Sequence, residues 1–174
     1  SAVFTSGAFA SEVKQSSSAA EILTRLNKSV YTHSKRGHFV AFLLAALDVE
    51  SKTLTFANAG QMKPLLKSNG SVQWLNSVGV NFPLGMKEDS VYGEQTVQLT
   101  SGDVLLLLTD GFTEAMNSSK EQFGTERMES FLHRLDADQT SSQKILERVT
   151  FEIERHVNGT AQHDDMTMVV VRVL

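Results

Sequence analysis

The sequence contains no cysteine, which excludes disulfide bonds, thiolate metal sites and cysteine nucleophiles. It contains only 2 prolines, and no low-complexity stretch marks a linker between domains. No apolar run is long enough to span a membrane, and no secretory signal is visible at its start. The formal net charge is −4 without a run of like charges, which argues against a surface for nucleic acid or anionic membranes. We therefore expect a cytoplasmic protein that neither binds nucleic acid nor inserts into a membrane.

What is present is the composition of a globular protein. The chain has 174 residues, of which 41% are hydrophobic and 21% are charged. This length suffices for one domain with a substantial core, and no internal repeat is visible. The sequence therefore predicts a single domain over residues 1–174, or a piece of one.

The most informative stretch is 103–117, which reads Asp-Val-Leu-Leu-Leu-Leu-Thr-Asp-Gly-Phe-Thr-Glu-Ala-Met-Asn. Its four leucines are too few for a membrane span and too unbroken for an amphipathic helix, so they predict a strand buried on both faces. The strand leads into Asp110-Gly111, where glycine permits a sharp turn and the acid is held rigidly at an edge of the core. Rigid carboxylates suit hard cations such as Mg²⁺ and Mn²⁺.

A second acidic turn precedes a second apolar strand, because Asp164-Asp165 lies just before the apolar run 168–171. Taken alone, Asp110-Gly111 is more often an ordinary turn between a strand and a short helix. Two acidic turns at the ends of two core strands, however, can converge on one site.

The remaining chain shows an alternation of helix and strand patterns. Helices are predicted over 1–13, 18–33, 125–135 and 140–157, and strands over 37–49, 54–59, 64–66, 72–75, 95–99, 104–108 and 166–173. Two capping boxes, Ser18 to Glu21 and Thr140 to Gln143, mark helix starts, and Asn69-Gly70 predicts a tight hairpin. The strand at 37–49 is expected to be buried and to form a hairpin with the strand at 54–59, across the polar turn at 50–52. This order is α+β and predicts two stacked antiparallel β-sheets with helices outside them.

Several short motifs occur together and in a fixed order along the chain. They are Leu26-Asn27, Ala59-Gly60-Gln61-Met62-Lys63-Pro64, Pro83-Leu84-Gly85, Gly102-Asp103-Val104-Leu105, Thr109-Asp110-Gly111-Phe112-Thr113-Glu114-Ala115, Phe123-Gly124 and Asp164-Asp165-Met166-Thr167. With these motifs the chain resembles the metal-dependent serine/threonine phosphatases of the protein phosphatase 2C type. The resemblance is closest to the bacterial branch similar to stage II sporulation protein E and to stress-response phosphatases that control sigma factors.

The resemblance implies a fold and a chemistry. The fold is a sandwich of two antiparallel sheets flanked by helices. The chemistry uses two Mn²⁺ or Mg²⁺ ions bridging a hydroxide that attacks the phosphorus of phosphoserine or phosphothreonine. Carried over by motif, Asp110 and Asp164 match the family's catalytic metal-binding aspartates. Asp165, where the family also accepts Asn, is the third metal candidate and is expected to lie behind the other two.

Two positions depart from the family pattern. The family usually has His where this chain has Gln61, which we interpret as a structural corner. The family's amino-terminal acids come from a Gly-Asp-x-x-Asp-like strand and a Gly-Asp-x-x-Gly-His-Gly segment, and neither is found in this sequence. The resemblance therefore predicts the carboxy-terminal portion of the phosphatase domain, lacking its first strands, which binds metal weakly or not at all and is inactive by itself.

Two hypotheses on function follow. The first is a phosphatase that dephosphorylates a small regulatory protein, of the type that antagonises an anti-sigma factor, in a bacterial signalling pathway. The second is a binding module with the phosphatase fold that no longer turns over and instead docks a regulatory partner. An exposed sheet edge would also favour self-association, so a homodimer is expected as a further partner state.

Overall fold

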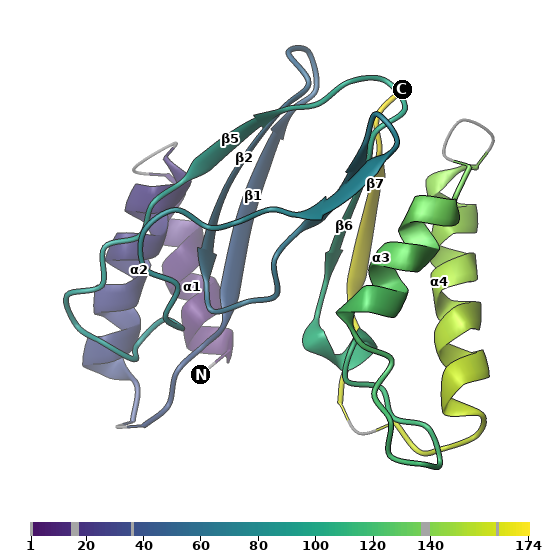
Figure 1. The fold of residues 1–174 in the computed structure, drawn as a ribbon. Coiled ribbons are helices and arrows are strands. Elements are labelled where there is room, and N and C mark those ends of the chain that lie inside the picture. The colour runs from purple at the N-terminus through teal and green to yellow at the C-terminus, as the bar shows by residue number, and fades with distance from the viewer. Residues whose placement is uncertain (1, 15–17, 36, 137–139, 163) are drawn as a thin grey trace. The chain divides into compact units, whose positions relative to one another are not determined.

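The computed structural model describes residues 2–14, 18–35, 37–136, 140–162 and 164–174. The chain divides into two compact units. The first comprises Ser1–Gln61 and Asn76–Gln98, and the second comprises Met62–Leu75 and Leu99–Leu174. Each unit contains one antiparallel sheet with helices packed on it, which confirms the α+β class (Figure 1).

The first unit has a three-stranded sheet in the order β1-β2-β5. Its elements are α1 (Ala2–Glu12), α2 (Ala19–His33), β1 (Phe42–Asp48), β2 (Thr53–Ala59) and β5 (Gln95–Gln98). Figure 1 shows α1 and α2 side by side on one side of this sheet. The core between α2 and the sheet is apolar and fully buried at Leu23, Leu26, Ala57 and Leu84.

The predicted start of α2 is confirmed at Ser18, whose hydroxyl accepts a hydrogen bond of 3.3 Å from the amide of Glu21. The predicted hairpin is also confirmed, because β1 pairs with β2 from Phe42 opposite Ala59 to Asp48 opposite Thr53. The cap and the hairpin are both local features, and local residue patterns predicted both of them.

The expected burial of the strand at 37–49 is wrong. The strand begins at Phe42, and its residues are half-buried or exposed. Leu47 is 39% exposed and Val49 is 76% exposed. Among the described strands, β1 has a partner only in β2, so it forms an edge of its sheet, and edge strands keep part of their surface in solvent.

The second unit has a four-stranded sheet in the order β4-β3-β6-β7. Its elements are β3 (Leu65–Ser68), β4 (Ser71–Trp74), β6 (Val104–Leu108), the 3₁₀ turn η1 (Asp110–Phe112), α3 (Thr125–Arg134), α4 (Ser142–Val157) and β7 (Met168–Arg172). The leucine strand β6 lies between β3 and β7, and Val104, Leu105, Leu106 and Leu108 are buried. The prediction of a strand buried on both faces is therefore confirmed.

The tight turn between β3 and β4 has the geometry that the sequence predicted. Asn69 and Gly70 adopt φ angles of 49° and 79°. Two consecutive residues with positive φ form the turn whose twist matches a two-residue hairpin, and Asn-Gly is the pair that adopts it most readily.

The predicted capping box of α4 lies one residue too early. The cap is Ser141, whose hydroxyl accepts a hydrogen bond of 3.3 Å from the amide of Lys144, whereas Thr140 is buried. Thr140 and Ser141 both carry a capping hydroxyl, so the sequence pattern alone did not distinguish them.

The carboxyl end of α3 is capped by a lysine from the sheet. The amine of Lys67 on β3 donates hydrogen bonds of 3.0 Å to the carbonyl oxygens of Leu132 and His133, and it also bonds to that of Leu135. Carbonyl groups in the last turn of a helix have no partner within the helix. Lys67 therefore fixes α3 to its sheet through the helix end.

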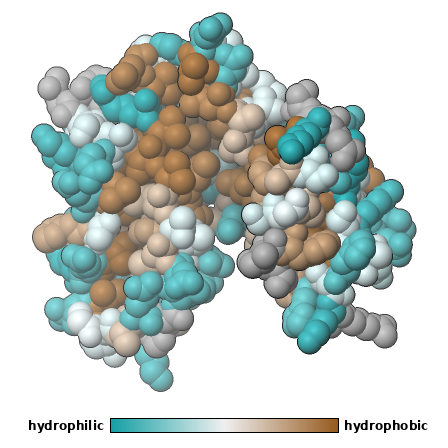
Figure 2. Space-filling view, turned by 180° about the vertical axis from the view of Figure 1, so that it is seen from behind, coloured by the Kyte–Doolittle hydropathy of each residue, from teal (hydrophilic) through white to brown (hydrophobic). Residues whose placement is uncertain are grey.

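Apolar residues also reach the surface, where they form the brown areas in Figure 2. The large exposed ones include Phe39, Val49, Val91, Phe151 and Val169. In the part of the chain that the structure describes, no helix is both long and apolar enough to cross a membrane.

Candidate functional site

The two acidic turns lie at the same end of two neighbouring strands. β6 and β7 are antiparallel, and Leu108 at the end of β6 pairs with Met168 at the start of β7. Asp110 follows the first strand and Asp164-Asp165 precedes the second. The register therefore brings the two candidate segments together, as the sequence predicted for acids at strand ends.

Thr109 joins the two segments directly. Its hydroxyl donates a hydrogen bond of 3.0 Å to the carbonyl oxygen of Asp165 and accepts one of 3.0 Å from the amide of Thr167. Its own amide donates to the carbonyl oxygen of Thr167 at 3.0 Å. This side chain therefore extends the β6–β7 pairing to the base of both acidic turns.

Gly111 allows the two turns to approach closely. A Cβ atom built at this position would lie 2.6 Å from the carbonyl oxygen of Asp165, which is shorter than a carbon–oxygen contact can be without displacement. The glycine of the Asp-Gly motif is therefore required by packing against the second acidic turn.

The backbone of Asp110 is fixed, while its side chain is exposed. Its carbonyl oxygen accepts hydrogen bonds of 2.8 Å from the amide of Glu114 and 3.0 Å from the hydroxyl of Thr113. The Asp164 side chain is also exposed and accepts a hydrogen bond of 2.7 Å from the amide of Asp165. The backbone of Asp110 is thus held by two hydrogen bonds, and the carboxylates of Asp110 and Asp164 are both open to solvent.

The chemistry of these groups fits a hard divalent cation, because Mg²⁺ and Mn²⁺ prefer carboxylate oxygens. Their number fits less well. Within the described ranges, no group of three or more His, Cys, Asp or Glu side chains could hold a metal ion. His163, next to Asp164, lies outside the described residues. The described donor set is therefore smaller than a two-metal centre requires.

Three buried polar residues outside the acidic turns form hydrogen bonds to backbone groups. The buried side-chain amide of Asn27 donates hydrogen bonds to the backbone carbonyl oxygens of Lys87 and Glu88. It also accepts one from the backbone amide of Gly85, and each of the three bonds is 2.9 Å long. Such a saturated buried amide fixes the loop that it contacts.

The buried side chain of Asn58 holds the backbone of Gln61 through two hydrogen bonds of 2.8 Å. The buried carboxylate of Asp103 accepts a hydrogen bond of 2.9 Å from the amide of Thr100. Asn58 and Asp103 therefore each bond to the backbone of a turn close to them in sequence.

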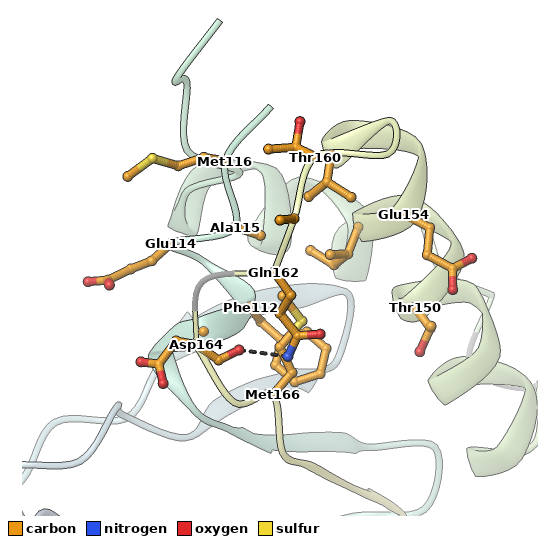
Figure 3. Close-up of a pocket in the computed structure, with 14 residues that line it drawn as sticks. Phe112, Glu114, Ala115, Met116, Thr150, Glu154, Thr160, Gln162, Asp164 and Met166 are labelled. Carbon is orange, nitrogen blue, oxygen red and sulfur yellow. Dashed lines mark hydrogen bonds between the residues drawn. The ribbon is translucent and has the colours of Figure 1, made fainter. Parts of the chain in front are cut away.

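A cavity of about 460 Å³ lies beside Asp164 and was not predicted from the sequence. In Figure 3, α4 with Thr150 and Glu154 forms one wall, and the segment with Gln162 and Asp164 forms another. The described lining residues fall within 111–116, 150–157, 160–162 and 164–166. No local sequence pattern joins 111–116 to the later segments, so only the folded chain reveals this cavity.

Comparison with known proteins identifies a matching family and two curated relatives. The family described as Stage II sporulation protein E (SpoIIE) matches residues 1–174. The protein IcfG of Synechocystis is 29% identical over 140 residues, covering 80% of this chain and 21% of that protein. The phosphoserine phosphatase RsbU of Bacillus subtilis is 22% identical over 160 residues, covering 88% of this chain and 44% of that protein. The chain thus spans less than half the length of these curated relatives.

Solved structures show the same fold. The SiaA-PP2C domain of Pseudomonas aeruginosa superposes with a TM-score of 0.79 at 22% identity, covering 98% of this chain and 68% of that one. The manganese-presoaked phosphatase domain of SpoIIE from Bacillus subtilis gives a TM-score of 0.67 at 20% identity, covering 97% of this chain and 73% of that one. With a family match over residues 1–174, the chain belongs to the Stage II sporulation protein E (SpoIIE) family.

Proposed function

We propose that this chain is the carboxy-terminal portion of a Mn²⁺- or Mg²⁺-dependent phosphatase domain that hydrolyses phosphoserine or phosphothreonine in a regulatory protein. The observation that carries the proposal is the link from Thr109 to Asp165, which brings the two acidic turns of the family motifs to one end of the β6–β7 pair. Membership in a family of phosphatase domains supports the same reaction class.

In this proposal Asp110 and Asp164 are the metal-binding acids, and Asp165 lies behind them. Metal ions in such a centre lower the pKa of a bound water and neutralise the oxygens of the phosphoryl group. The chain's own contribution is to hold two exposed carboxylates on fixed backbone. Gly111 and Thr109 keep the two turns at a constant separation, because one permits their close approach and the other bonds them together.

The shortage of acidic ligands has a consequence for this chain by itself. A two-metal centre carries four positive charges, and each ion takes about six oxygen ligands. With Asp110, Asp164 and Asp165 as the acids available, we propose that the isolated chain holds at most one weakly bound ion and has no appreciable turnover. In this proposal, acids from residues other than 1–174 would complete the two-metal centre.

The partner in this proposal is a phosphorylated regulatory protein that antagonises an anti-sigma factor, encountered in the cytoplasm. The similarity to RsbU, a phosphoserine phosphatase, supports phosphoserine as the group that is hydrolysed. Exposed apolar side chains such as Phe39 and Val49, together with the edge strand β1, also favour a homodimer, because exposed apolar patches and open sheet edges promote association.

Two measurements test the proposal. Calorimetric titration of the 174-residue chain with Mn²⁺ should give at most one weak binding event, and a phosphoserine peptide should not be hydrolysed. A longer protein that contains this chain should hydrolyse the same peptide only when Mn²⁺ or Mg²⁺ is present. Two tightly bound ions with clear turnover from the 174-residue chain would show that it supplies all the ligands itself.

The alternative function is a binding module with the phosphatase fold. The small number of acidic ligands in the described residues favours it. The two functions differ in the longer protein, because a silent module would bind the phosphorylated partner without releasing phosphate whatever metal is added.

A further inference from the structure

The cavity beside Asp164 has an apolar interior. Phe112, Ile153 and Met166 contribute to its lining, and Phe112 and Ile153 belong to the buried core of the second unit. Its volume of about 460 Å³ lies within the range of about 300–1,000 Å³ that is usual for ligand sites. The cavity is therefore large enough to accept a group from another molecule and apolar enough to favour one that carries hydrocarbon.

The charged residues among the described lining residues of the cavity are all acidic. Glu114, Glu154 and Asp164 belong to its lining, and none of the described lining residues is Lys, Arg or His. All three acids are exposed. A group with a hydrocarbon stem and a positively charged tip would match both parts of the cavity, because the stem contacts the apolar interior while the tip stays near the acids. Lys and Arg side chains have this form.

The cavity also lies against one of the candidate metal acids, Asp164. Gly111 and Asp164 are part of its lining. The side-chain amide of Gln162, another lining residue, donates a hydrogen bond of 2.6 Å to the backbone carbonyl oxygen of Asp164 (Figure 3). A side chain in the cavity would therefore contact the segment that carries Asp164. A residue close in sequence to a phosphoserine bound at these acids could reach the cavity.

We propose that this cavity binds a Lys or Arg side chain from an apolar segment of the protein substrate, close to its phosphorylated residue. The description of that segment as substrate rests on the proposed function, whereas binding of the basic side chain does not. The cavity would thus select substrates that carry a basic residue beside the phosphorylation site.

The test measures binding to the 174-residue chain without metal and without turnover. The probe is a fluorescent, unphosphorylated decapeptide with a central Leu-Arg pair between Gly and Ser residues. A version with citrulline in place of Arg has the same shape without the charge. We expect fluorescence anisotropy to show about fivefold tighter binding of the Arg peptide, since exposed ion pairs contribute up to about 1 kcal/mol each. Replacing Leu by Ser should also weaken binding.

Two variants on α4 locate the site. Thr150→Phe places a ring in the cavity and should weaken binding of the Arg peptide at least about tenfold, as expected when a buried contact of more than 1.4 kcal/mol is lost. Glu154→Gln should weaken it about threefold, within the range for one exposed ion pair. Glu147→Gln is the matched control, because Glu147 lies seven residues earlier on the same helix and outside the lining.

Circular dichroism checks that each variant is folded. If Thr150→Phe is not folded, NMR of the wild-type chain locates the site instead. The backbone amide chemical shifts that change on addition of the peptide should then centre on 111–116 and 150–157. Equal binding of the citrulline and Arg peptides, or shifts elsewhere, would overturn the proposal. Binding of butylguanidine as tight as that of the peptide would assign the cavity to a small cation. Because no metal or hydrolysis is involved, failure of the phosphatase assay leaves these results interpretable.

Discussion

The hydroxyl of Thr109 donates a hydrogen bond of 3.0 Å to the carbonyl oxygen of Asp165, so the residue before one acidic turn holds the backbone of the other. The same hydroxyl accepts from the amide of Thr167. One side chain thus satisfies a donor and an acceptor of the second turn, and the spacing of the two turns depends on it.

Thr109→Val tests this link, because valine keeps the shape and removes the hydroxyl. We expect the free energy of unfolding to fall by about 1 kcal/mol, the usual net value of a hydrogen bond outside the core. Hydrogen exchange should accelerate at the amide of Thr167. Thr96→Val is the control, since Thr96 lies exposed on β5 and its hydroxyl bonds only to that of Thr55 among the described contacts. Equal exchange at Thr167 in both variants would contradict the role of Thr109.

Gly111→Ala tests the close approach of the two turns. The added methyl group would lie 2.6 Å from the carbonyl oxygen of Asp165, and we expect a loss of about 1–3 kcal/mol in unfolding free energy, as for other overpacked sites. Gly7→Ala is the matched control, because its added Cβ would meet nothing within 4 Å inside helix α1. That change should stabilise the chain by about 0.5–1 kcal/mol. Urea unfolding measures both, and loss of stability in the Gly7 variant alone would refute the steric argument.

Asp110→Asn and Asp164→Asn test the proposed metal acids in a longer protein that contains this chain. Each replacement removes an anionic ligand while the exposed position of the side chain leaves the core unchanged. We expect Mn²⁺-dependent hydrolysis of a phosphoserine peptide to be abolished and the melting temperature without metal to stay the same. Asp89→Asn, at an exposed position in the first unit, should retain full activity. Normal turnover from the Asp110 variant would contradict the proposal that Asp110 is a metal ligand.

Stability at alkaline pH should depend on Tyr92. Burial raises the pKa of Tyr92 above its ordinary value of 10.0, partly opposed by a hydrogen bond with Ser90. A raised pKa in the folded state means that the neutral phenol is favoured by folding. This stability is fully present below the unfolded-state pKa of about 10 and is lost as pH rises through the folded-state pKa.

Tyr92→Phe should remove that alkaline loss. At pH 8 the variant should be less stable by about 1 kcal/mol, because the phenol of Tyr92 donates a hydrogen bond of 2.7 Å to the carbonyl oxygen of Phe82. The difference between the urea midpoints of wild type and variant should therefore be smaller at pH 11 than at pH 8. Tyr31→Phe serves as the control, since Tyr31 is 43% exposed. A wild-type midpoint that falls no faster than that of the Tyr92 variant would contradict the prediction.

Sequence patterns predicted the features that depend on neighbours in the chain. The leucine run of β6, the cap at Ser18 and the Asn69-Gly70 hairpin all follow from local residue types, and the structure has each of them. The side-by-side position of the two acidic turns was also predictable, because both lie at ends of apolar strands.

Features that depend on distant residues were not predictable. The apolar run before Asp48 has the composition of a buried strand, yet β1 is exposed because burial depends on which strands lie beside it. The cap that Lys67 forms on α3 joins residues 65 to 68 positions apart, and nothing in the sequence near Lys67 indicates it. The cavity beside Asp164 likewise exists only once α4 packs near the second acidic turn.

The pairing of β6 with β7 has a consequence for the order of events during synthesis. Thr109 and Thr167 are 58 positions apart, so at about 5–20 residues per second a ribosome needs about 3–12 s to make the second strand after the first. During that interval the leucine strand has only β3 beside it and presents an open apolar edge. Chains whose synthesis stops before Met168 keep that edge permanently, and they are the species that chaperones and proteases would have to remove.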